Sequence, residues 1–133
     1  MWKLLWFFCV PWTPTPVASA YPEQYGYMTD RWYPLVEEAL EVYGIPDEID
    51  TFMRVLHCES RGDPNAHNTV VYENPKDQAS GLMQHMPRWW DDRSTAAGFG
   101  GYSPFDPVAN IFTSAWLLTS RGGGWSHWTC YGL

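Results

Sequence analysis

Residues 49–60 read IDTFMRVLHCES, and their periodicity predicts a helix with one apolar face. Apolar side chains recur at the spacing i, i+3, i+4 and i+7, as Ile49, Phe52, Met53 and Leu56. At about 100° per residue, Glu59 falls at the edge of this face beside Phe52, and Ser60 falls inside it. Burial disfavours the charged form of a carboxyl group, so we expect a raised pKa at Glu59.

Helix signals elsewhere predict a mostly α fold. We expect a first helix over residues 30–43, capped by Asp30 and stopped by Gly44, and Pro46 should open the helix that carries Glu59. Two further helices are expected over about residues 87–97 and 107–120, separated by Gly- and Pro-rich connections. In the polar segment 61–80, residues 69–72 read TVVY and could form a short strand or hairpin arm.

Length and charge exclude several classes of protein. The 133 residues suit one small domain, and the net charge of −7 with two lysines argues against nucleic acid as a partner. Nine Trp, eight Tyr and six Phe are many for this length. They could form a core of large side chains or line a groove that stacks on sugar rings, and composition does not choose between the two.

The first twenty residues have the organisation of an export signal. A short positive start is followed by an apolar run over residues 4–10 and by Ala18-Ser19-Ala20, an A-x-A cleavage pattern. The apolar run is far shorter than the about 20 residues of a membrane-spanning helix. We therefore expect a signal peptide at residues 1–20, a mature domain at residues 21–133, and a secreted or extracytoplasmic protein without stable membrane insertion.

An exported chain would retain two cysteines, Cys58 and Cys130. In an oxidising compartment the simplest interpretation of such a pair is one disulfide. The alternative is a metal site that adds His57 and His127 to the two cysteines. Neighbouring residues such as His57 and Cys58 point in different directions on a helix, which argues against a shared ion, so we expect no metal and no cofactor.

Two runs carry a resemblance to a known family. Glu59-Ser60 is followed at residues 79–87 by ASGLMQHMP, and residues 105–111 read FDPVANI. These segments resemble the soluble lytic transglycosylases, and Gly-Leu-Met-Gln-x-Met-Pro in register behind Glu-Ser is a specific match. A Cys directly before the Glu and a late Trp-x-x-Trp-x-Cys also resemble the resuscitation-promoting factors, which share the lysozyme-like domain and join these positions by a disulfide.

The resemblance implies an α+β lysozyme-like domain that acts as a monomer on peptidoglycan glycan strands. Glu59 would be the catalytic acid that cleaves the β-1,4 bond after N-acetylmuramic acid and then acts as base, leaving 1,6-anhydromuramic ends. The other candidate substrate-binding residues have different grounds. Gln84 and Met86 match groove positions of the family, Ser60 would support Glu59 locally, and Asn68 falls where some members carry a substrate-contacting Ser.

The chain also departs from the family. No Ala-Tyr-Asn-x-Gly segment is present, and Trp125, Trp128 and Tyr131 are candidates to replace its Tyr, although no spacing singles one of them out. Core packing behind the disulfide is an equal alternative for the two tryptophans. The segment at residues 69–78 is longer than in many relatives and could reshape the groove, and the four histidines are expected to be bystanders.

Other functions are consistent with the same residues. A muramidase of this fold would hydrolyse the same bond with water and would need a second carboxylate, for which Asp63, Glu73 and Asp77 are candidates. A non-catalytic wall-binding or signalling module would not need Glu59. In that case the carboxylate could simply pair with Arg54 or Arg61 at the helix end.

Overall fold

A computed structural model describes residues 21–70 and 72–133 of the chain. Within these residues the fold is a small helical domain without β-strands. The α-helices are α1 (Tyr27–Asp30), α2 (Tyr33–Val42), α3 (Ile49–Ser60), α4 (Pro87–Ala96) and α5 (Pro107–Thr119). Short 3-10 helices complete it: η1 (Pro46–Glu48), η2 (Pro75–Asp77), η3 (Trp125–His127) and η4 (Thr129–Gly132). The predicted signal at residues 1–20 lies outside the described residues.

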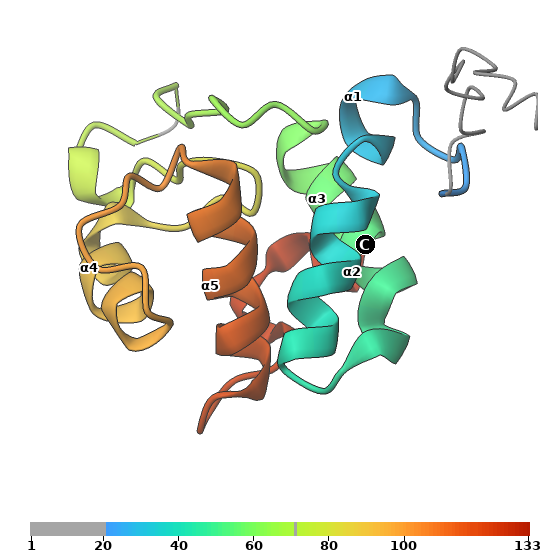
Figure 1. Ribbon diagram of the computed structural model, residues 1–133. Coiled ribbons are helices and arrows are strands. Elements are labelled where there is room, and N and C mark those ends of the chain that lie inside the picture. Colours follow the sequence, from blue (N-terminus) through green and yellow to red (C-terminus); the bar gives the residue numbers. More distant parts are fainter. Residues whose placement is uncertain (1–20, 71) are drawn as a thin grey trace, which may run out of the picture.

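Helix α5 occupies the middle of the domain. It packs against α2 on one side and α4 on the other, while α3 packs against α2 and against the C-terminal η4 (Figure 1). Because α3 and α5 both pack against α2, the end of α3 has a defined position relative to the loops around α5. The mostly helical lysozyme-like fold class expected from the sequence is confirmed.

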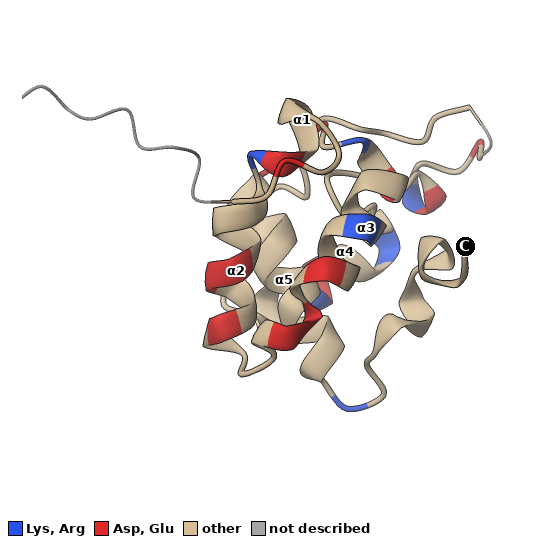
Figure 2. Ribbon diagram, turned by 90° about the vertical axis from the view of Figure 1, so that its right-hand side faces the viewer, with Lys and Arg blue, Asp and Glu red and all other residues tan. Residues whose placement is uncertain are grey.

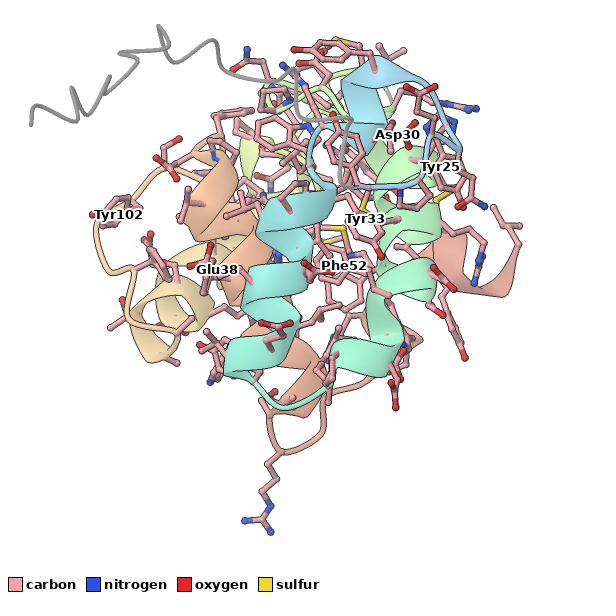
Figure 3. All side chains as sticks on the ribbon, turned by 45° about the vertical axis from the view of Figure 1, so that its right-hand side comes forward. Tyr25, Asp30, Tyr33, Glu38, Phe52 and Tyr102 are labelled. Atoms are coloured by element: carbon pink, nitrogen blue, oxygen red, sulfur yellow. A yellow bond between two sulfur atoms is a disulfide. The ribbon has the colours of Figure 1, made fainter. Side chains whose placement is uncertain are left out.

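The start of the first predicted helix is wrong. Helix α2 begins at Tyr33 rather than Asp30, and Asp30 instead ends the separate turn α1. The carboxylate of Asp30 accepts hydrogen bonds from the backbone N–H groups of Gln24, Tyr25 and Gly26, at 2.9 to 3.1 Å. Figure 3 shows Asp30 beside Tyr25. The predicted N-cap therefore binds the chain that precedes it instead of capping the helix that follows.

The other helix boundaries agree with the sequence to within a few residues. Pro46 opens the 3-10 turn that leads into α3, and α4 and α5 each begin at the predicted proline. Asp106 caps α5, because its side chain accepts a 2.9 Å hydrogen bond from the N–H of Ala109.

No strand forms over the described part of residues 69–72, where Thr69, Val70 and Tyr72 lie in irregular backbone and Val71 is outside the described residues. Val70 is 94% exposed, so this arm has no apolar surface to pack against. Among the described residues, pairing is limited to isolated antiparallel bridges, His67 with Ser80 and Ser80 with His85. The expected hairpin arm is thus replaced by a loop.

The core lies between α2, α3 and α5. Phe52, Met53 and Leu56 of the predicted stripe are buried and Ile49 is half-buried, while Val55 widens the buried face. Phe52 lies between α2 and α3 (Figure 3). Burial of each large side chain contributes roughly 1.5–3 kcal/mol, so this interface holds α3 firmly in place.

A disulfide joins the last turn of α3 to η4. Cys58 and Cys130 are bonded across 72 residues of sequence, with their Cα atoms 5.9 Å apart. This confirms the predicted pairing and removes the two thiolates that the alternative metal site requires. The same junction is reinforced by Arg54, whose guanidinium donates to the carbonyl oxygens of Cys130, Tyr131 and Leu133 at 3.3 Å.

Two further features are absent from the described residues. No helix among them is long and apolar enough to cross a membrane. Residues 21–70 and 72–133 contain no group of three or more His, Cys, Asp or Glu side chains placed to hold a metal ion.

Replacing both Cys58 and Cys130 by Ser should lower stability by about 4 kcal/mol, because the cross-link restricts a long loop in the unfolded chain. For a domain of this size the melting temperature should fall by roughly 15 °C, which circular dichroism would measure. Wild type reduced with dithiothreitol should approach the same value. Equal melting temperatures for wild type and double variant would contradict this role of the disulfide.

Candidate active site

Glu59 lies in the last turn of α3, partly buried at the end of the apolar face. The helix stops directly after it, because Arg61 takes a left-handed conformation with φ 55° and Gly62 continues at φ 77°. Burial raises the pKa of Glu59 above its ordinary 4.5, and a backbone hydrogen bond from Cys130 opposes this shift by stabilising the carboxylate. The raised pKa expected from the sequence therefore has the expected cause.

Ser60 lies behind Glu59 and is only 7% exposed. Its hydroxyl donates to the carbonyl oxygen of Leu56 at 3.1 Å and accepts from the N–H of Gly62 at 3.1 Å. Ser60 is therefore placed to close the end of α3, in agreement with local support of Glu59. It does not line the pocket that contains Glu59, which argues against a direct substrate contact.

The run from Gly81 to Pro87 forms the opposite wall and is held by α5. The fully buried amide of Asn110 accepts from the N–H of Met83 at 2.9 Å and donates to the carbonyl oxygen of Pro104 at 2.8 Å. The indole N–H of Trp128 donates to the carbonyl oxygen of Met83 at 2.8 Å. These bonds tie the wall to α5 and to the C-terminal segment.

Gln84 lies in this wall and has an unusual backbone conformation. Its φ is 52°, a left-handed value that non-glycine residues adopt rarely. The side-chain amide nitrogen donates to the carbonyl oxygens of Ala66 at 3.1 Å and Gly81 at 2.9 Å. The two hydrogen bonds fix the side chain where it borders the pocket.

A pocket of about 200 Å³ separates the two walls, and we call it the acid pocket. It is lined by Glu59, Asn68, Tyr72, Asp77, Ala79, Gln84, Met86, His127, Trp128 and Thr129. The structure thus brings four of the five predicted site residues together. Asn68, the weakest of the predicted contacts, is placed there by the loop, where its N–H donates to the carbonyl oxygen of Ala79 at 2.9 Å.

Asp77 brings a second carboxylate into the acid pocket. Of the three acidic candidates, Asp77 alone lines it, whereas Asp63 and Glu73 do not. Its side chain is engaged by Arg88, with Nε and Nη2 at 2.7 and 2.6 Å from Oδ1. Both contacts go to one oxygen, so Oδ2 of Asp77 is not used by this pair.

Three further lining residues were not among the predicted substrate-site residues: Tyr72, His127 and Thr129. Tyr72 stands in a polar loop whose path no local pattern specifies. For His127 and Thr129 a signal existed, because a Cys58–Cys130 bond must bring the neighbours of Cys130 close to the neighbours of Cys58. His127 therefore lies at the acid pocket, and the expectation that the histidines are bystanders stays a prediction.

The late aromatic residues serve mainly as packing. Trp125 donates its N–H to Glu48 at 2.9 Å and stacks on Tyr131, with ring centroids 5.6 Å apart. Neither Trp125 nor Tyr131 lines the acid pocket. Trp128 is only 5% exposed and combines both functions, since it packs in the core and presents an edge to the pocket.

His85 is a structural residue of the motif. It is 2% exposed, and its Nε2 lies 2.7 Å from the hydroxyl oxygen of Ser114. Burial, with smaller contributions from the positive charges of Arg93 and His127, lowers its pKa to about 3. The imidazole therefore remains neutral at ordinary pH and acts as a hydrogen-bonding core residue.

Comparison with known protein families agrees with this site. The family described as Transglycosylase SLT domain matches residues 34–131, which include both walls of the acid pocket and the disulfide. Searches among curated proteins and among solved structures found no significant match. Because the family match covers well over half of the 133 residues, the chain belongs to the transglycosylase SLT domain family.

Proposed function

We propose that this protein is a peptidoglycan lytic transglycosylase with Glu59 as its single catalytic acid and base. The observation that carries the proposal is the environment of Glu59. It is a partly buried carboxyl group with a raised pKa, in a pocket whose other wall is the family motif. The substrate would be the β-1,4 bond between N-acetylmuramic acid and N-acetylglucosamine.

The reaction needs one proton donor that later accepts a proton. Protonated Glu59 gives its proton to the glycosidic oxygen as the bond from the muramyl C1 to that oxygen breaks. The resulting carboxylate takes the proton of the muramyl 6-hydroxyl, whose oxygen then bonds to C1. The products are a free N-acetylglucosamine 4-hydroxyl and a 1,6-anhydromuramic end, with no water consumed.

The groove residues would orient the sugars for this step. Gln84, Met86 and Asn68 border the same pocket as Glu59 and supply polar and apolar contacts to substrate. Tyr72, 44% exposed in the loop at the mouth of the pocket, adds an aromatic surface. Together they form two sides of a cradle around one acid.

Hydrolysis of the same bond is a second candidate because Asp77 shares the acid pocket. A muramidase needs a carboxylate that activates water or stabilises the sugar cation, and Oδ2 of Asp77 is oriented by the Arg88 pair without being occupied by it. The transglycosylase assignment is preferred because the family match and the raised pKa of Glu59 both favour Glu59 as the proton donor.

The proposed place of action is outside the cytoplasm, where peptidoglycan lies. The Cys58–Cys130 disulfide is consistent with an oxidising compartment. Export through a signal at residues 1–20 and action as a monomer complete the proposal.

Glu59→Gln should reduce peptidoglycan cleavage roughly 100- to 10,000-fold, because the amide keeps the shape of the side chain but cannot donate the proton. Zymography and turbidity assays on purified cell walls would measure the loss. The matched control is Glu38→Gln on the exposed face of α2, which should retain full activity. Unchanged clearing by Glu59→Gln would contradict Glu59 as the catalytic acid, whereas no clearing by the wild type would favour the non-catalytic wall-binding module.

The products should carry 1,6-anhydromuramic ends, which differ from reducing ends by the mass of one water. Mass spectrometry of digested peptidoglycan separates the two, and Asp77→Asn should leave the anhydro products unchanged in kind. Reducing ends that disappear in Asp77→Asn would instead establish the muramidase reaction with Asp77 as its second carboxylate.

The activity should fall as pH rises through the raised pKa of Glu59, because only the protonated acid donates; kcat/KM against pH would show this limb above 4.5. The folded state holds this proton more tightly than the unfolded chain, so the wild type should also lose stability between pH 4.5 and the raised pKa. Glu59→Gln does not titrate, and its melting temperature relative to wild type should rise over that interval. A constant difference between pH 4 and pH 8 would contradict the burial of this carboxyl group.

A further inference from the structure

We propose that a second pocket, which we call the arginine pocket, binds a carboxylate of the peptide stem carried by the muramyl sugar. It is formed by Arg93, Trp89 and His127 beside the acid pocket. The inference rests on the proposed function, because it names the part of peptidoglycan that the groove recognises besides the glycan.

The arginine pocket has a volume of about 220 Å³ and adjoins the acid pocket. The two share four lining residues: Gln84, Met86, His127 and Trp128. Arg93 and Trp89 come from α4, six and two residues beyond its start at Pro87. If the scissile bond of a glycan strand lies at Glu59, a substituent on a neighbouring sugar would therefore lie beside the arginine pocket.

The charge of this pocket is unbalanced. No acidic residue lines it, and in the part of the chain that the structure describes, the salt bridge is that of Arg88 with Asp77 and none engages Arg93. Arg93 is half-buried, and this burial lowers the pKa of its guanidinium. The positive charge of Arg93 also acts on the buried His85.

Uncompensated positive charge is unexpected in a protein with a net charge of −7. Acidic residues are plentiful elsewhere, and α2 carries them on successive turns (Figure 2). Removing a guanidinium from water without an acidic partner costs free energy, and an anionic ligand would offset that cost. The absence of an internal partner at Arg93 thus points to a partner in the ligand.

A carboxylate fits the pocket best among anions. The planar guanidinium of Arg93 can bind both oxygens of a carboxylate, and the pocket offers one such fork and no cluster of basic groups for a polyanion. Trp89, 50% exposed, supplies an apolar surface for the peptide next to it. The glycan backbone itself is neutral, so carboxylates of the proposed substrate lie on the stem peptide or on the lactyl group when the stem has been removed.

The test measures binding to Glu59→Gln protein, in which ligand is not cleaved. Three tetrasaccharide probes are compared by tryptophan fluorescence or calorimetry: one with tetrapeptide stems, the same glycan after amidase removal of the stems, and N-acetylchitotetraose, which has no carboxylate. Adding Arg93→Gln should weaken binding of the stem-bearing probe about tenfold and leave N-acetylchitotetraose unchanged. Arg93→Lys should keep part of the affinity, and the matched control Arg121→Gln, in an exposed loop, should keep all of it.

The outcomes separate the alternatives. Loss confined to the stem-bearing probe supports the stem as the source of the carboxylate, whereas loss confined to the amidase-treated glycan would overturn this and assign the pocket to the lactyl carboxylate. Equal loss on all three probes, or none, would overturn a carboxylate site. Failure of every probe to bind Glu59→Gln protein with Arg93 intact would count against both the proposed function and the inference that rests on it. If the stem-bearing probe binds equally well with and without Arg93→Gln, the result counts against this inference alone.

Discussion

The buried side-chain amide of Asn110 holds the groove together. It connects the N–H of Met83 in the motif with the carbonyl oxygen of Pro104 in the loop that leads into α5. Gly81 passes so close to this amide and to Pro104 that a Cβ atom there would collide with both. A buried donor or acceptor left without its partner costs roughly 1–3 kcal/mol, so loss of the amide would release several segments at once. The position of Gln84 and Met86 relative to Glu59 therefore depends on a residue that is fully buried and does not line the acid pocket.

Around this wall the domain has two further restraints with different chemistry. The end of α3 is covalently attached to η4 by the disulfide, while Ser60 closes the helix terminus by hydrogen bonds. The Cys130 backbone that the disulfide positions also hydrogen-bonds the Glu59 carboxylate. Core packing, a disulfide and several hydrogen bonds thus all restrain the position of the Glu59 carboxyl group.

The sequence predicted the parts of the fold that depend on local patterns. The apolar spacing of residues 49–60 predicted α3 and the edge position of Glu59, and proline marked the starts of α4 and α5. Asp30 misled because an aspartate before a helix can satisfy backbone N–H groups on either side, and here it binds those that precede it. Residues 69–72 have strand-forming side chains but no neighbouring strand, and pairing is a non-local property that a short pattern cannot supply.

The same division applies to the site. Glu59, Gln84 and Met86 were found because helical phase and a motif identify them within a few residues of sequence. Tyr72 and Asp77 enter the acid pocket through a loop, and His127 enters it from the far end of the chain, so their places depend on tertiary structure. The lack of acidic residues in the pocket around Arg93 likewise depends on tertiary structure, because α4 and the C-terminal segment both line that pocket.

The orientation of Gln84 determines the polarity of the groove wall. The side-chain amide nitrogen donates two hydrogen bonds, and their acceptors are the backbone carbonyl oxygens of Ala66 and Gly81. The amide has two hydrogens, and both are used inside the protein. What remains for a ligand is the carbonyl oxygen alone. This wall can therefore receive a proton-bearing group such as an acetamido N–H or a sugar hydroxyl, and it repels a bare acceptor in the same place.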